Sequence, residues 1–186
     1  MAATVAIESG FPFVKVVSAE AMVGFSEPAK CQFLAKVFDD AYKSPLSVIV
    51  LDEIERLLEY VAIGPRFSNA VLQTILVLLK KHPPPGRRLF VIGTSSMGFV
   101  MEEMSITQTF NVTLNVHSLT REEMKIVLKH VGAFQGPDVE VAVAELQEGI
   151  PIKKLLLLVD IARQGAPEEQ PFIPIQKWTQ VVRDMM

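Results

Sequence analysis

Two adjacent carboxylates at the end of an apolar run are the strongest chemical signal in the sequence. Asp52 and Glu53 follow residues 48–51, Val-Ile-Val-Leu, and a continuous apolar run is typical of a strand buried on both faces of a parallel sheet. Open parallel sheets bind ligands at the carboxyl ends of their strands. In nucleotide-hydrolysing sheets the first acid at this place supports a Mg²⁺ ion and the second orients or deprotonates water. The alternative is a strand that runs directly into a polar helix start over residues 53–59.

Hydroxyl side chains follow a second apolar run that is typical of a buried strand. The run 89–93, Leu-Phe-Val-Ile-Gly, is followed by Thr94, Ser95 and Ser96. These hydroxyls could contact a phosphate or an attacking water beside the acids, or they could cap a helix that begins after Met97. The glycines of this segment, at positions 93 and 98, lie five residues apart, so they do not form the Gly-x-Ser-x-Gly motif of a hydrolase nucleophile. A hydrolase triad is therefore not predicted.

One of two lysine pairs is a further candidate for contact with a phosphate. Lys153 and Lys154 open a helix predicted over residues 152–163, although lysines in such a position commonly lie in solvent. Lys80 and Lys81 end a predicted helix, where cations complement the helix dipole. The three histidines and the single cysteine are far apart in the sequence, so a zinc site is not predicted.

Composition narrows the class of protein. The chain has 186 residues, of which 49% are hydrophobic, and this excludes intrinsic disorder. Its 18 basic and 21 acidic residues give a net charge of −3, which argues against nucleic acid or an anionic membrane as an obligatory partner. The first residues carry no basic region ahead of an apolar stretch, so no secretory signal is predicted. A single cysteine fits a reducing compartment, and we expect a cytoplasmic protein.

The predicted elements define an α/β layer followed by helices. Strands are predicted over 13–17, 47–51, 89–93 and 110–116, and helices over 30–42 and 67–81 lie between them. This alternation predicts right-handed crossovers and a parallel sheet. Beyond residue 116 the pattern is helical, over 120–131, 139–147, 152–163 and 175–185, with a capping box at Thr120 and Glu123. We therefore expect an α/β domain over residues 1–117 and a small helical domain over 118–186.

Two longer stretches carry a resemblance to a known family. The order of the elements and motifs described above resembles the AAA+ ATPases. Two stretches, residues 43–60, from Lys-Ser-Pro-Leu-Ser through Asp-Glu-Ile-Glu-Arg-Leu-Leu-Glu-Tyr, and residues 63–69, Ile-Gly-Pro-Arg-Phe-Ser-Asn, resemble in particular the second ATPase domain of the vesicle-fusing ATPases. The resemblance implies a P-loop-type parallel sheet with a helical lid, ATP and Mg²⁺ as cofactors, and ATP hydrolysis. It also implies a homo-hexamer that takes SNARE complexes apart through adaptor proteins, without nucleic acid and with only peripheral membrane contact.

The resemblance also assigns roles by position. Asp52 and Glu53 resemble the Walker B acids, with Asp52 at the metal, and Ser96 occupies the sensor-1 position. Lys153, followed by Lys154, resembles the sensor-2 lysine that faces the terminal phosphate. Lys80 matches a lysine that reaches the nucleotide of the neighbouring subunit.

Residues 22–25, Met-Val-Gly-Phe, occupy the pore-loop position. Two departures from the family pattern qualify these roles. First, no Gly-x-x-x-x-Gly-Lys-[Ser/Thr] motif occurs in the sequence. Under the resemblance the chain begins just after that motif, so the central first strand of the sheet is missing and the chain alone is expected to be inactive. The segment after Ser96 also lacks the arginine pair of active members, which implies slow hydrolysis. The alternatives are a non-catalytic interaction module that joins or caps the hexamer, or another AAA+ protein such as a clamp-loader-like subunit.

Overall fold

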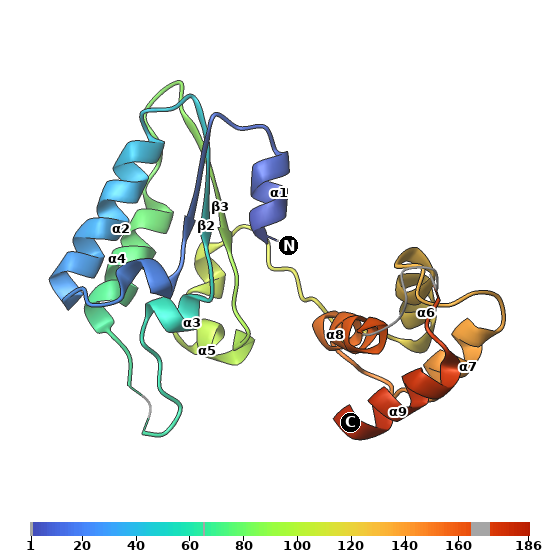
Figure 1. Ribbon diagram of the computed structural model, residues 1–186. Helices are drawn as coiled ribbons and strands as arrows, with labels where there is room; N and C mark the ends of the chain where they lie inside the picture. The colour runs from blue at the N-terminus through green and yellow to red at the C-terminus, as the bar shows by residue number, and fades with distance from the viewer. Residues whose placement is uncertain (1, 65, 165–171) are drawn as a thin grey trace. The chain divides into compact units, whose positions relative to one another are not determined.

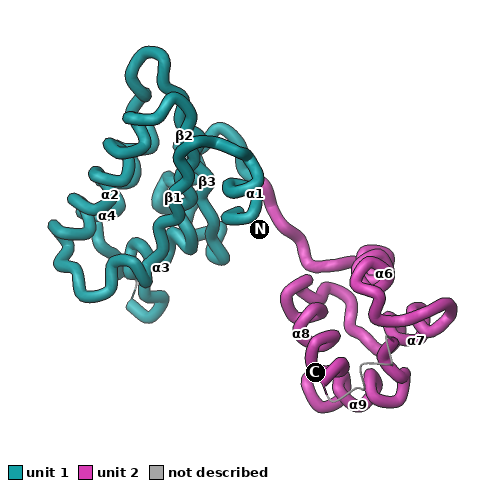
Figure 2. The backbone as a smooth tube through the Cα atoms, turned by 45° about the horizontal axis from the view of Figure 1, so that its top comes forward, with its two compact units in different colours: residues 1–113 teal, residues 114–186 magenta. Residues whose placement is uncertain are grey.

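The chain forms two compact units. The computed structural model describes residues 2–64, 66–164 and 172–186, and it divides into unit 1, residues 1–113, and unit 2, residues 114–186 (Figures 1 and 2). This division lies close to the expected domain boundary at residue 117. No helix in the described ranges is long and apolar enough to cross a membrane.

Unit 1 is built on a three-stranded parallel sheet. Its strands β1 (Phe13–Val17), β2 (Leu46–Leu51) and β3 (Arg88–Gly93) are arranged in the order β1-β2-β3. The crossovers contain α2 (Glu27–Ala41), between β1 and β2, and α4 (Asn69–Lys80), between β2 and β3. Three of the four predicted strands and the parallel α/β class are thus confirmed.

The central strand β2 is covered on both faces. Ile49 and Leu51 belong to the larger core cluster, which includes residues of α2 and α4. Val48 and Val50 point to the opposite face and pack with Ala6 of α1 (Ala2–Glu8). Because successive side chains of a strand point to opposite faces, a strand covered on both sides must be apolar at every position. This explains the continuous apolar run that precedes Asp52.

The fourth predicted strand, over residues 110–116, is wrong. The structure has no strand there, and the side chains of Val112, Leu114 and Val116 are 70%, 84% and 71% exposed. Their alternation with polar residues is a strand pattern, but a strand exists only through ladder hydrogen bonds to a neighbour. Among the described strands β1 and β3 pair with β2 alone, so neither forms a ladder with this segment.

Short helices complete unit 1. α3 (Ile54–Leu57) follows β2 and α5 (Gly98–Glu103) follows β3, and two 3₁₀ turns, η1 (Ala19–Met22) and η2 (Thr107–Thr109), lie in the connections. The longer helix α4 begins after Ser68, whose Oγ accepts a hydrogen bond of 3.2 Å from the N–H of Val71. This cap explains why α4 begins two residues later than the sequence predicts.

Unit 2 consists of helices around one apolar core. α6 (Arg121–His130), α7 (Asp138–Ala144), α8 (Ile152–Arg163) and α9 (Ile175–Met185) follow the predicted order, and the capping box of Thr120 and Glu123 is present. Trp178 is fully buried, and its indole N–H donates to the carbonyl of Ala142 at 3.0 Å. Its ring meets that of Phe134 edge to face, with centroids 5.2 Å apart. One aromatic side chain thus joins α9 to α7 and to the turn after α6.

Candidate functional site

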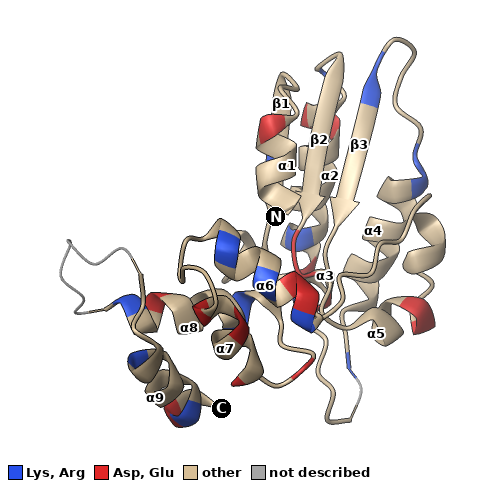
Figure 3. Cartoon of the chain, turned by 90° about the vertical axis from the view of Figure 1, so that its right-hand side faces the viewer, with Lys and Arg blue, Asp and Glu red and all other residues tan. Residues whose placement is uncertain are grey.

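The carboxyl ends of β2 and β3 bring the predicted acids and hydroxyls together. The register pairs Leu51 with Gly93, so the segments that follow these two residues leave the sheet side by side. The acidic residues after β2 lie at the tip of its arrow, directly ahead of α3 (Figure 3). This is the edge at which open parallel sheets bind ligands.

Thr94 connects the two segments through its side chain. Its Oγ1 donates to Oδ1 of Asp52 at 2.7 Å and accepts from the N–H of Glu53 at 2.8 Å. The backbone of Thr94 adds two further bonds, from its N–H to the carbonyl of Leu51 and from the N–H of Ile54 to its carbonyl, both 2.9 Å. In the sequence Thr94 is one of three consecutive hydroxyl residues, and no motif separates it from Ser95 and Ser96.

Glu53 has an unusual backbone conformation. Its φ of 50° and ψ of 66° are left-handed, which is uncommon for a residue with a side chain, and it stands directly before α3. Oε2 of Glu53 lies 3.2 Å from Nε of Arg56, and both side chains are largely exposed. The acids therefore end a buried strand and also precede a short helix, so the two interpretations weighed for this segment describe the same turn.

Ser96 contacts Glu55, an acid that the sequence did not single out. Its Oγ and its N–H donate to Oε1 of Glu55 at 2.6 and 2.9 Å. Glu55 is only 6% exposed, and its Oε2 is buried without a hydrogen-bond partner among the described residues. Burial alone would raise the pKa of Glu55, but the hydrogen bonds from Ser96 and Ser95 lower it below its ordinary value. Glu55 is thus held as a charged anchor for Ser96.

None of the three hydroxyls caps α5, so the capping alternative for them is wrong. The residue that caps α5 is Met97, without a side-chain bond to the helix, and Oγ of Ser95 accepts from the N–H of Met97 at 3.0 Å. Position relative to the strand end is the one sequence signal that could have singled out Thr94, because it is the first residue after β3. No such signal marks Glu55, since its burial depends on the packing of α3.

The lysines named in the sequence are distributed over both units. Lys80 is the exposed last residue of α4. A crossover helix runs antiparallel to the strands it joins. The carboxyl end of α4, with Lys80, therefore lies at the amino-terminal edge of the sheet, and Asp52 lies at the other edge. Lys81 lies 3.6 Å from Asp39 and 5.1 Å from the ring of Tyr42. Lys153 and Lys154 are exposed in the first turn of α8, in unit 2.

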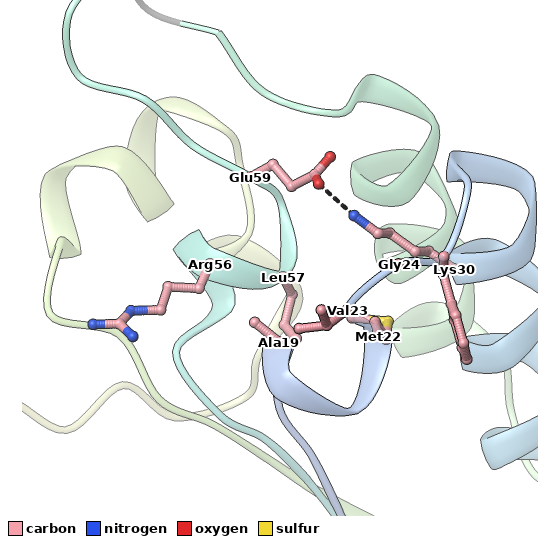
Figure 4. A pocket seen from close by; sticks show the side chains of 9 residues that line it. Ala19, Met22, Val23, Gly24, Lys30, Arg56, Leu57 and Glu59 are labelled. Carbon is pink, nitrogen blue, oxygen red and sulfur yellow. Dashed lines mark hydrogen bonds and ion pairs between the residues drawn. The ribbon is translucent and has the colours of Figure 1, made fainter.

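The segment at the pore-loop position borders a cavity of about 340 Å³. Met22 is buried, whereas Val23 is 80% exposed and Gly24 has a φ of +81°. On the other side of this cavity Lys30 of α2 forms an ion pair with Glu59 (Figure 4). The described residues hold no cluster of three or more His, Cys, Asp or Glu side chains that could bind a metal without further ligands.

A comparison with protein families identifies the class. Residues 1–117 match the model of the ATPase family associated with various cellular activities, AAA. The chain therefore belongs to the AAA ATPase family, and the resemblance found in the sequence is confirmed. Membership implies nucleotide binding, and it places Asp52 and Glu53 within the matched region.

Particular relatives narrow the resemblance. The chain is 52% identical over 165 residues to the vesicle-fusing ATPase of Arabidopsis thaliana. This match covers 89% of the chain and 22% of that relative. It is 44% identical to the vesicle-fusing ATPase of Dictyostelium discoideum and 42% identical to the vesicular-fusion protein sec18 of Schizosaccharomyces pombe, in each case over 93% of the chain and 23% of the relative. The chain thus spans less than a quarter of the length of these relatives.

Proposed function

We propose that unit 1 supplies the acidic edge of an ATP and Mg²⁺ site in a vesicle-fusing AAA ATPase. The observation that carries the proposal is the hydrogen-bonded group formed by Asp52, Glu53 and Thr94 at the carboxyl ends of β2 and β3. The matches to two vesicle-fusing ATPases, which each cover about nine-tenths of the chain, support the same assignment.

The residues at this edge fit one half of such a site. Mg²⁺ in nucleotide sites takes one or two carboxylates and completes its shell with phosphates and water, so the single half-buried Asp52 is a sufficient protein ligand. When bound, the ion would neutralise charge on the phosphates. Asp52 would hold it, and Glu53 would orient water. The phosphate half needs a glycine-rich loop, and no such motif occurs in the 186 residues.

The remaining assignments are part of the same proposal. Ser96, hydrogen-bonded to Glu55, would act as sensor 1. Lys153, with Lys154, would approach the terminal phosphate. As the resemblance in the sequence implies, the whole protein would act in the cytoplasm as a homo-hexamer that separates SNARE complexes through adaptors, with peripheral membrane contact. Lys80 would reach the nucleotide of a neighbouring subunit, and its place at the far edge of the sheet is compatible with contact to another copy.

The test uses a chimera of the Arabidopsis relative in which this chain replaces the matching segment. Asp52→Asn should weaken Mg²⁺-ATP binding at this site, measured as a higher Mg²⁺ concentration for half-maximal ATP binding, because the metal loses its carboxylate. Glu53→Gln should leave binding intact and lower any hydrolysis at this site. Glu102→Gln, at an exposed position on α5, is the matched control and should change neither. An equal Mg²⁺ requirement and equal turnover in all four proteins would contradict the assignment.

The isolated chain provides a second measurement. Without a phosphate loop the triphosphate lacks most of its contacts, so Mg²⁺-ATP should not raise the melting temperature of the chain. A cooperative melt that ATP shifts upward by several degrees would show that these residues bind the phosphates in another way.

The role of Lys80 is tested by sedimentation of the chimera in Mg²⁺-ATP. Lys80→Ala should weaken the hexamer, because a cation at a partly dehydrated interface pairs with phosphate. Lys36→Ala, an exposed lysine on α2, should not. If the Lys80 variant stays hexameric down to the same dilution as the parent, Lys80 only complements the dipole of α4.

A further inference from the structure

We propose that Thr94 is the residue that positions the acidic edge, through a side-chain hydroxyl that fixes both Asp52 and Glu53. This inference rests on the proposed function, since it assigns a role in the same nucleotide site. It goes beyond that function because the resemblance places Ser96, and not Thr94, at the polar sensor position.

The geometry of Thr94 satisfies the full requirement of such a role. A hydroxyl has one proton to donate and lone pairs with which to accept. Thr94 uses both: Oγ1 donates to Oδ1 of Asp52 at 2.7 Å and accepts from the backbone N–H of Glu53 at 2.8 Å. The position of the hydroxyl is fixed because the backbone of Thr94 is hydrogen-bonded to Leu51 of β2 and to Ile54 of α3, both at 2.9 Å. Thr94 is therefore an anchored bridge between the strand ends.

Each of the two side-chain bonds has a separate consequence. The bond to Asp52 fixes one carboxylate oxygen and so limits the rotation of the side chain proposed to hold the metal. The bond from Glu53 gives its amide an acceptor at the point where the backbone turns into the left-handed region, at φ 50°. A residue in that region persists only when its surroundings fix it, and Thr94 is the side chain that does so.

Ser96 is not available for the same task. Both its hydroxyl and its amide donate to Oε1 of Glu55, so its proton is already committed. Thr94 and Ser96 thus serve two different acids. A substitution at Thr94 should act on the metal through Asp52, whereas a substitution at Ser96 should first disturb Glu55.

The test compares Thr94→Val, Thr94→Ser and Thr74→Val in the chimera described above. Valine keeps the shape of threonine and removes the hydroxyl, and serine keeps the hydroxyl. Thr74→Val makes the same chemical change on α4, where the hydroxyl donates only to the carbonyl of Ala70. Thr94→Val should raise the Mg²⁺ concentration needed for half-maximal ATP binding by about 10-fold or more, the scale at which partners of metal ligands act. Thr94→Ser should restore the parent value, and Thr74→Val should not depart from it.

A double substitution separates positioning from a general loss of structure. If Thr94 acts through Asp52, adding Thr94→Val to Asp52→Asn should cost no further Mg²⁺ affinity, because the two changes remove one shared interaction. An additive loss, or a Thr94→Val protein that binds Mg²⁺-ATP like the parent while Asp52→Asn does not, would overturn the role of Thr94 alone. Asp52→Asn without any effect would instead contradict the proposed function, and the role of Thr94 with it.

Amide exchange in the isolated chain gives a readout that needs no nucleotide. The N–H of Glu53 should exchange faster in Thr94→Val than in the parent or in Thr94→Ser. Unchanged protection of that amide would show that the hydroxyl does not hold the turn, and would overturn the proposal even if binding were altered.

Discussion

Unit 1 and unit 2 each enclose an apolar core, but they use polar side chains differently. In unit 1, short hydrogen bonds from Thr94 and Ser96 join the segments that follow β2 and β3. In unit 2, Trp178 is fully enclosed, and polar bonds serve the ends of helices, as where Arg163 donates to the carbonyl of Val131 at 2.7 Å.

The difference indicates where chemistry and where stability reside. A parallel sheet collects side chains from separate crossovers at one edge, so unit 1 can place an acid beside a hydroxyl that lies 42 residues away in the chain. The helices of unit 2 bury a contiguous core of their own and leave their polar residues to cap and solvate helices. We therefore expect unit 2 to depend on packing, and the acidic edge of unit 1 to depend on hydrogen bonds.

The largest effect should come from emptying the core of unit 2. Trp178→Ala removes a fully buried side chain and leaves the carbonyl of Ala142 without its donor, so the unit should lose about 3–5 kcal/mol of stability. Hydrogen exchange should show lost protection of the amides of α7 and α9 with that of β2 retained, because the two cores share no residue. Equal loss of protection in both units would contradict the separation drawn here.

A smaller effect should follow from adding one methyl group at the end of β3. A Cβ at Gly93 would lie 2.8 Å from Cδ1 of Ile54 and from Cζ of Phe110, so Gly93→Ala should cost about 1–3 kcal/mol by overpacking. Gly98→Ala is the matched control, since its Cβ meets nothing within 4 Å. Urea unfolding curves of both variants measure the difference, and equal midpoints would show that the end of β3 tolerates the methyl group.

The smallest effect concerns the pH dependence that Glu55 contributes. Its folded-state pKa is lowered by the bonds from Ser96, so its stabilising contribution is fully present above the pKa of the unfolded chain and is lost as pH falls through the lower folded-state pKa. Glu55→Gln should therefore flatten the stability curve on the acid side of its ordinary value of 4.5. Glu102→Gln should leave the curve of the parent unchanged, and identical acid transitions in all three proteins would remove the assigned role of Ser96.

The amino-acid sequence by itself determined most elements of the fold. Ile152–Arg163 and Ile175–Met185 match their predicted ranges, and the capping box at Thr120 is present, because helix periodicity and caps are local properties. The three confirmed strands were predictable because burial on two faces imposes an apolar run. The segment 110–116 was not predictable by the same means, since a strand also needs a neighbour, which a local pattern does not contain.

The candidate site shows the same division. Asp52 and Glu53 could be predicted because the end of a buried strand is visible in the sequence, and their family roles followed from the resemblance. Only the tertiary structure decided that Thr94 bonds to Asp52 and that Ser96 bonds to Glu55, because both pairs depend on the register between β2 and β3. Register is set by the packing of whole strands and their crossovers, and a shift of one residue would exchange the faces on which these side chains lie.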